Sequence, residues 1–117
     1  MNLRAIRGAI QVEANTPEEI ASGVKELLPA ILQANHLTTD EVISVILTCT
    51  PDLNAAFPAA FAREIGFGAV PLLCAVEMDV PGALPLVIRV MLHAQLKSVA
   101  NHVYLRGATS LRKDLAQ

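Results

Sequence analysis

One arginine lies in the middle of an otherwise apolar segment. Arg89 belongs to the run LPLVIRVML at positions 84–92, a pattern that predicts a buried strand. A guanidinium keeps its charge at physiological pH, and an unpaired charge in a low-dielectric interior costs several kcal/mol. Arg89 must therefore face an anion or a solvated cleft. On spacing alone, an internal carboxylate such as Glu77 or Asp79 satisfies this need as well as a ligand in a solvated cleft.

Three further arginines are among the other side chains that could share such a cleft. Guanidinium groups bind carboxylates in a forked geometry, which suits a small polyanionic ligand. The sequence has no G-x-S-x-G, P-loop, H-E-x-x-H or G-x-G-x-x-G motif. A site of this kind can still catalyse by positioning and charge stabilisation, and a unimolecular rearrangement is one such reaction. The candidate residues besides Arg89 are Arg7, Arg63, Arg112, Glu77, Cys74 and Tyr104.

Composition limits the kinds of partner that this chain can have. The 117 residues fit one domain, 1–117, and are 53% apolar but only 17% charged, so surplus apolar surface indicates an oligomer. Nine basic and eleven acidic residues give a net charge of −2, and aromatics are only 3%. With no basic block and no set of stacking aromatics, we expect no nucleic-acid partner.

Membranes and metals are not expected either. No apolar run approaches the roughly 18 residues of a membrane span, and no signal-peptide core follows Met1. Cys49 and Cys74 form no C-x-x-C pair or disulfide framework, which is typical of a reducing compartment. The three histidines lack metal-ligand spacing. We therefore expect a cytoplasmic protein without metal or cofactor.

The elements that must position the candidate residues alternate along the chain. Strands are predicted at 3–13, 42–50, 69–78, 86–95 and 102–107. A helix is predicted from Thr16, its N-cap, to about 36, and a short helix from Pro58 to 65. This order indicates one small α+β domain whose mixed, mostly antiparallel sheet carries its helices on one face. The polar segment 110–117 is expected to be a flexible tail.

Side-chain parity sorts some of the candidates between the two faces of the sheet. Residues three apart on a regular strand point to opposite faces. Of Arg4 and Arg7, therefore, only one is expected to share a cleft with Arg89. Cys74 and Glu77 are also three apart, so we expect them to face opposite sides of their strand.

Six segments, in order and with compatible spacing, resemble the monofunctional chorismate mutases of the Bacillus type. The resemblance covers nearly the whole chain. It implies a homotrimer that forms a pseudo α/β barrel, with active sites between adjacent subunits. It also implies rearrangement of chorismate to prephenate without a cofactor. The segments are IRGA (6–9), TPDL (50–53), FPA (57–59), CAVEMDV (74–80), IRVM (88–91) and HVYL (102–105).

The resemblance also implies roles for the residues of the site. Arg89 would stabilise the charge that builds on the breaking ether oxygen and would contact a carboxylate. Arg7 and Tyr104 would hold the carboxylate of the enolpyruvyl side chain. Glu77 would accept a hydrogen bond from the ring hydroxyl, close to Cys74.

The remaining implied positions lie around the entrance of the site. Phe57 would form an apolar wall, and Arg63 and Arg112 would line the solvent side and attract the dianion. Because of the parity at 74 and 77, we expect one chain to serve two clefts. Cys74 would then lie with Phe57 and Arg63 of its own subunit. Glu77 would lie in the neighbouring site with Arg7, Arg89 and Tyr104. The chain has Ala60 where the family often has Lys. The main alternative is a non-catalytic trimeric α+β module that binds small carboxylates, and a structural oligomer with an Arg89–Glu77 pair is a third.

Overall fold

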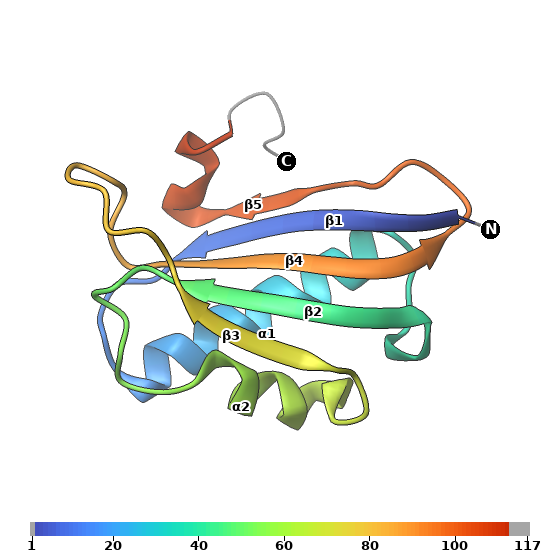
Figure 1. The fold of residues 1–117 in the computed structure, drawn as a ribbon, viewed down its shortest axis with the longest axis horizontal. Coiled ribbons are helices and arrows are strands. Elements are labelled where there is room, and N and C mark those ends of the chain that lie inside the picture. Colours follow the sequence, from blue (N-terminus) through green and yellow to red (C-terminus); the bar gives the residue numbers. More distant parts are fainter. Residues whose placement is uncertain (1, 113–117) are drawn as a thin grey trace.

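Five strands form a single mixed sheet in the order β3-β2-β4-β1-β5 (Figure 1). The computed structural model describes residues 2–112. The central strand β4 pairs antiparallel with both β1 and β2, whereas the β1–β5 and β2–β3 pairs are parallel. The strands are β1 (Asn2–Gln11), β2 (Val42–Cys49), β3 (Leu72–Val76), β4 (Val87–Leu96) and β5 (Val103–Leu105).

Two helices lie on the same face of this sheet. The long helix α1 (Pro17–Ala34) runs behind the strands, and α2 (Pro58–Ala62) packs beside it near β3 (Figure 1). Thr16 caps α1 as predicted, because its hydroxyl accepts the Glu19 N–H at 3.0 Å. The short helix η2 (Arg63–Phe67) continues α2 and turns at Gly66, whose φ is +101°. The remaining short helices are η1 (Thr39–Glu41) and η3 (Arg106–Ser110).

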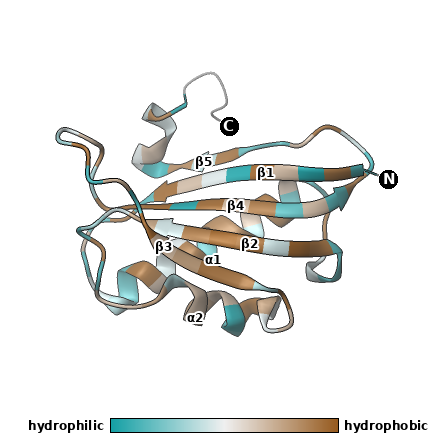
Figure 2. Cartoon of the chain, viewed as in Figure 1, coloured by the Kyte–Doolittle hydropathy of each residue, from teal (hydrophilic) through white to brown (hydrophobic). Residues whose placement is uncertain are grey.

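The core lies between the helices and the inner face of the sheet. Alternate residues of each strand point inward, and the apolar stripe of α1 packs against them. Figure 2 shows the resulting pattern, with strands mostly in the hydrophobic colour and interrupted by polar positions on β1 and β4. Fully buried members include Ile6, Ile10, Ile20, Leu27, Leu28, Ile31, Leu47, Ile88 and Leu92. The fold is thus the predicted α+β domain.

Neither α1 nor α2 covers the outer face of the sheet, where η3 packs at one end through Ala108. The apolar run around Arg89 predicted a buried strand, and Val87, Ile88, Val90 and Leu92 of this run are buried. The side chain of Arg89 points to the outer face and is 44% exposed. An apolar run identifies a strand but does not say which of its faces is covered. Within residues 2–112, no helix is long and apolar enough to cross a membrane.

The predicted tail at 110–117 is only partly described. Ser110 ends η3, and Leu111 donates its N–H to the carbonyl of Ala108 at 3.0 Å. Leu111 also packs against a small cluster around Tyr104. Residues 113–117 lie outside the described part of the chain, so the expectation of a flexible tail remains a prediction.

Candidate active site

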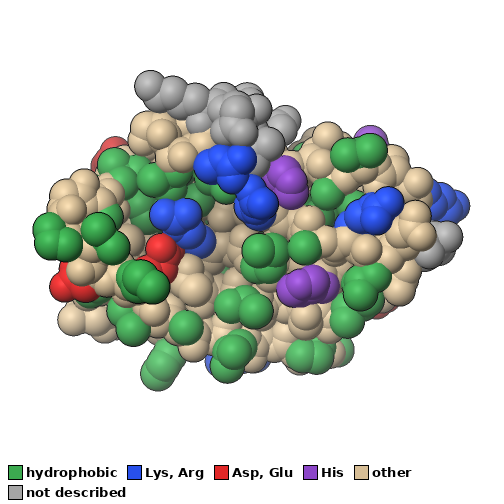
Figure 3. All heavy atoms as spheres, turned by 45° about the horizontal axis from the view of Figure 1, so that its top comes forward, with side chains coloured by type: hydrophobic (Ala, Val, Ile, Leu, Met, Phe, Trp, Pro, Cys, Tyr) green, Lys and Arg blue, Asp and Glu red, His purple; other side chains and the backbone are tan. Residues whose placement is uncertain are grey.

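A cleft of about 240 Å³ opens on the outer face of the sheet and is lined by charged side chains from several strands. Strand register places its members in one row across the sheet: Tyr104 lies beside Ala9, Ala9 beside Arg89, and Arg89 beside Thr48. On this side of the molecule, basic side chains gather next to a histidine and a carboxylate (Figure 3). The lining residues are Arg7, Gly8, Ile46, Thr48, Arg89, Val90, Met91 and Tyr104.

Arg89 has a partner for its charge but not for its N–H groups. Its Nε lies 3.0 Å from Oε1 of Glu77, whose side chain is 17% exposed. Glu77 follows β3, and its N–H donates to the carbonyl of Cys49 at the end of β2, which brings the carboxylate beside the cleft. The Arg89 guanidinium nevertheless donates no hydrogen bond within residues 2–112. Its donors therefore remain available to a ligand.

Arg7 and Tyr104 offer further unused donors in the same cleft. The guanidinium of Arg7 makes no hydrogen bond to the described residues, and Arg7 rather than Arg4 lines the cleft with Arg89, in line with the parity argument. The Tyr104 ring is buried against Ala9 and Ala108. The Tyr104 hydroxyl makes no hydrogen bond to residues 2–112. Every buried side-chain oxygen in these residues does have a hydrogen-bond partner. The hydroxyl is therefore not buried and is open to the cleft.

A histidine adjoins the basic residues. The backbone N–H of Arg7 donates to Nδ1 of His102 at 2.9 Å, so the ring proton resides on Nε2. Burial lowers the pKa of His102, and the positive charges of Arg7 and Arg112 lower it further. The charge of Arg112 therefore acts on the same histidine as that of Arg7, although Arg112 does not line the cleft. His102 remains neutral and keeps its acceptor at neutral pH.

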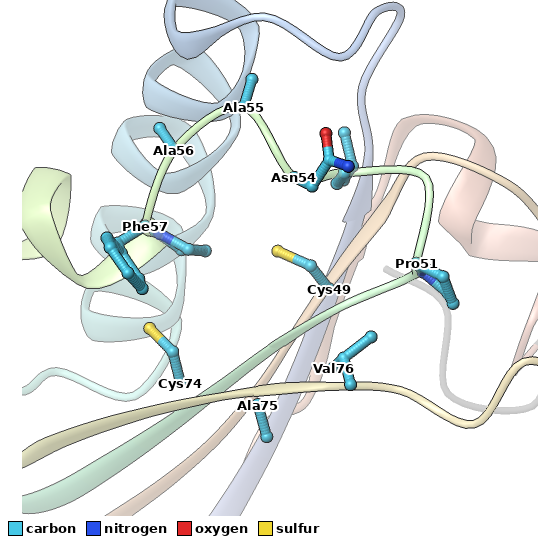
Figure 4. A pocket seen from close by; sticks show the side chains of 11 residues that line it. Cys49, Pro51, Asn54, Ala55, Ala56, Phe57, Cys74, Ala75 and Val76 are labelled. Atoms are coloured by element: carbon cyan, nitrogen blue, oxygen red, sulfur yellow. The ribbon is translucent and has the colours of Figure 1, made fainter.

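A second, larger cleft of about 450 Å³ lies at the edge of the sheet (Figure 4). Cys74 and Cys49 direct their sulfur atoms toward it, opposite Phe57 on the loop before α2. The lining is mainly apolar and extends from Pro51 to Pro58 and from Cys74 to Val76. Burial is the main cause that raises the pKa of Cys49 to about 12, so this thiol is not a nucleophile at neutral pH.

The two clefts divide the predicted site residues. Cys74 packs against the core side of β3, whereas Glu77 contacts Arg89 on the outer face, so the predicted separation of these residues is found. Phe57 lies with Cys74, as expected. Arg63 is exposed on η2 and lines neither cleft of its own chain, in contrast to its expected place beside Cys74.

Sequence reasoning missed Thr48 and the contact of His102. Thr48 lines the cleft of Arg7, Arg89 and Tyr104, which we call the arginine cleft. Its hydroxyl donates to Oε2 of Glu77 at 2.9 Å. The alternation of β2 puts Thr48 on the outer face, but its place beside both Glu77 and Arg89 depends on strand order. Residues 2–112 hold no cluster of three or more potential His, Cys, Asp or Glu metal ligands. The arrangement instead offers fixed cations and free donors to an anion.

Comparison with known proteins identifies close relatives. A family model described as chorismate mutase type I matches residues 3–115. Chorismate mutase AroH of Thermus thermophilus is 50% identical over 97% of this chain and 96% of its own length. Chorismate mutase AroH of Bacillus subtilis is 44% identical over 99% and 94%. A solved chorismate mutase from Clostridium thermocellum is 44% identical and superposes with a TM-score of 0.89, covering 92% of this chain and 98% of that one.

Proposed function

The chain belongs to the chorismate mutase type I family, and we propose that the cleft between Arg7, Arg89 and Tyr104 is where it converts chorismate to prephenate. The enzyme is an isomerase of aromatic amino-acid biosynthesis. The observation that carries the proposed location is the convergence in one cleft of donors from β1, β4 and β5 that have no hydrogen-bond partner among residues 2–112. Such donors suit a small dicarboxylate.

The reaction needs charge stabilisation more than proton transfer. In the rearrangement the ether carbon–oxygen bond breaks while a carbon–carbon bond forms, and negative charge builds on the ether oxygen. A cation fixed beside that oxygen binds the transition state more tightly than the substrate and so lowers the barrier. Arg89 fills this role, because Glu77 balances the charge of the guanidinium and leaves the N–H donors of Arg89 unused within residues 2–112.

The neighbouring groups orient the substrate around Arg89. Arg7 and the Tyr104 hydroxyl bind the carboxylate of the enolpyruvyl side chain, and both lie on the β1–β5 side of Arg89. Glu77 lies on the β2–β3 side and accepts a hydrogen bond from the ring hydroxyl. This division keeps the carboxylate of Glu77 away from the substrate's anionic groups, which would otherwise repel it.

A second subunit completes the site in this proposal. The Phe57 side chain is 75% exposed, and the cleft that it shares with Cys74 is mainly apolar. In a homotrimer forming a pseudo α/β barrel, this cleft of one subunit closes the arginine cleft of the next. Arg63 and Arg112 then line the entrance and attract the dianion. The free thiols Cys49 and Cys74 support a cytoplasmic location.

Loss of chorismate absorbance on mixing with the pure protein tests the function. We expect saturable turnover at submicromolar enzyme, formation of prephenate and no effect of EDTA. Binding of chorismate without turnover would instead support a carboxylate-binding module and contradict the mutase assignment. Light scattering tests the assembly separately, since a trimer has three times the mass of the 12.5 kDa chain.

A further inference from the structure

Thr48 pairs with Arg89 in the sheet and hydrogen-bonds to Glu77, although no motif in the sequence points to it. It pairs with Arg89 across the β2–β4 ladder and with Ala75 across the β2–β3 ladder. Glu77 lies two residues beyond Ala75, so its side chain reaches the same face of the sheet. The Thr48 hydroxyl donates to Oε2 of Glu77 at 2.9 Å, while Oε1 faces Nε of Arg89 at 3.0 Å.

The two oxygens of Glu77 therefore have different partners. An arginine and a carboxylate left to themselves favour a forked pair in which two N–H groups donate to both oxygens. That arrangement would use the donors of Arg89. Here the pair is an ion contact in which Arg89 donates no hydrogen bond to residues 2–112, while Oε2 accepts the hydroxyl of Thr48 on the neighbouring strand.

We propose that Thr48 is a positioning residue, which keeps Glu77 turned so that it balances the charge of Arg89 and leaves the guanidinium donors to the substrate. This inference rests on the proposed function and assigns Thr48 a part in the same site. The hydroxyl acts through Glu77 and is not itself a group that binds the reacting atoms.

Paired substitutions separate the hydroxyl from the rest of the side chain. Thr48→Val keeps the shape but removes the donor, and we expect kcat/KM to fall by about tenfold or more, the effect of one hydrogen bond to a charged group. Thr48→Ser keeps the donor and should stay within about twofold of wild type by the same reasoning. Thr39→Val, on η1 and outside both clefts, is the matched control and should retain wild-type kinetics and Tm.

A crystal structure of Thr48→Val gives the second readout. We expect the released Glu77 carboxylate to rotate and to form a forked, hydrogen-bonded pair with Arg89. Unchanged kinetics in this variant, or a loss that Thr48→Ser does not rescue, would overturn the inference. Reduced activity with Glu77 unmoved would also overturn it, because Thr48 would then act on the substrate directly. A wild-type protein without turnover would refute the proposed function instead.

Discussion

Replacing Arg89 with lysine tests the role of its fixed donors. Lysine keeps the positive charge but has one nitrogen, which can pair with Glu77 or approach the substrate but cannot do both. In the structure Nε of the guanidinium lies 3.0 Å from Oε1 of Glu77, and the guanidinium donates no hydrogen bond to residues 2–112. Loss of one preorganised donor at a developing oxyanion costs about 10²–10³ in kcat, or about 3–4 kcal/mol.

We therefore expect Arg89→Lys to lower kcat at least about 100-fold while the fold stays intact. Its side chain is 44% exposed, so the free energy of unfolding should change by at most about 1 kcal/mol. Chorismate absorbance gives kcat, and urea denaturation gives the stability. Arg4→Lys is the matched control, since Arg4 is exposed and lies outside the cleft. Wild-type kcat in Arg89→Lys would refute the role at the ether oxygen.

Three further predictions concern the parts around the cleft. Both carboxylate oxygens of Asp52 accept the backbone N–H of Leu86, at 3.0 and 3.1 Å. Leu86 has a strained backbone, with a φ of +56°. Asp52→Ala should thus lower the free energy of unfolding by about 1–3 kcal/mol in urea denaturation, and an unchanged midpoint would contradict this. Folding raises the pKa of Cys49 from its ordinary value of 9.0 to about 12. At pH values between these two, the thiol loses its proton only in the unfolded chain. The free energy of unfolding should therefore decrease as the pH rises through this range, by up to about 1.4 kcal/mol per pH unit. Cys49→Ala should flatten that slope in a pH series of denaturation curves. Phe57→Ala should raise KM by about tenfold, because the apolar contact of the ring with the substrate is lost. The control Val99→Ala, at an exposed loop position, should leave KM unchanged. Equal KM values in the two variants would contradict the role of Phe57 as an apolar wall of the site.

Much of the fold could be predicted because local signals agreed with it. Thr16 and Pro17 mark the start of α1, and Gly66 ends the second helical segment. Parity predicted that only one of Arg4 and Arg7 shares the cleft with Arg89, and it separated Cys74 from Glu77. These inferences need only the periods of strands and helices, which are fixed by backbone geometry.

The errors came from properties that depend on the assembled sheet. Spacing alone did not decide whether Arg89 pairs with an internal carboxylate or faces a solvated cleft, because which face of β4 is covered depends on where α1 packs. Thr48 carried no recognisable motif, because its contact with Glu77 requires β2 to lie between β3 and β4. The Arg7–His102 hydrogen bond likewise joins residues 95 positions apart. Strand order, which creates these contacts, is not specified by short-range patterns.

A crystal structure with a bicyclic transition-state analogue tests the central claim most directly. We predict that the ether oxygen of the analogue lies within hydrogen-bond distance of the Arg89 guanidinium, with one carboxylate on Arg7 and Tyr104. The Phe57 and Cys74 cleft of an adjacent subunit should cover the opposite side. An analogue bound away from Arg89, or seated only in the cleft of Cys49 and Cys74, would contradict the account.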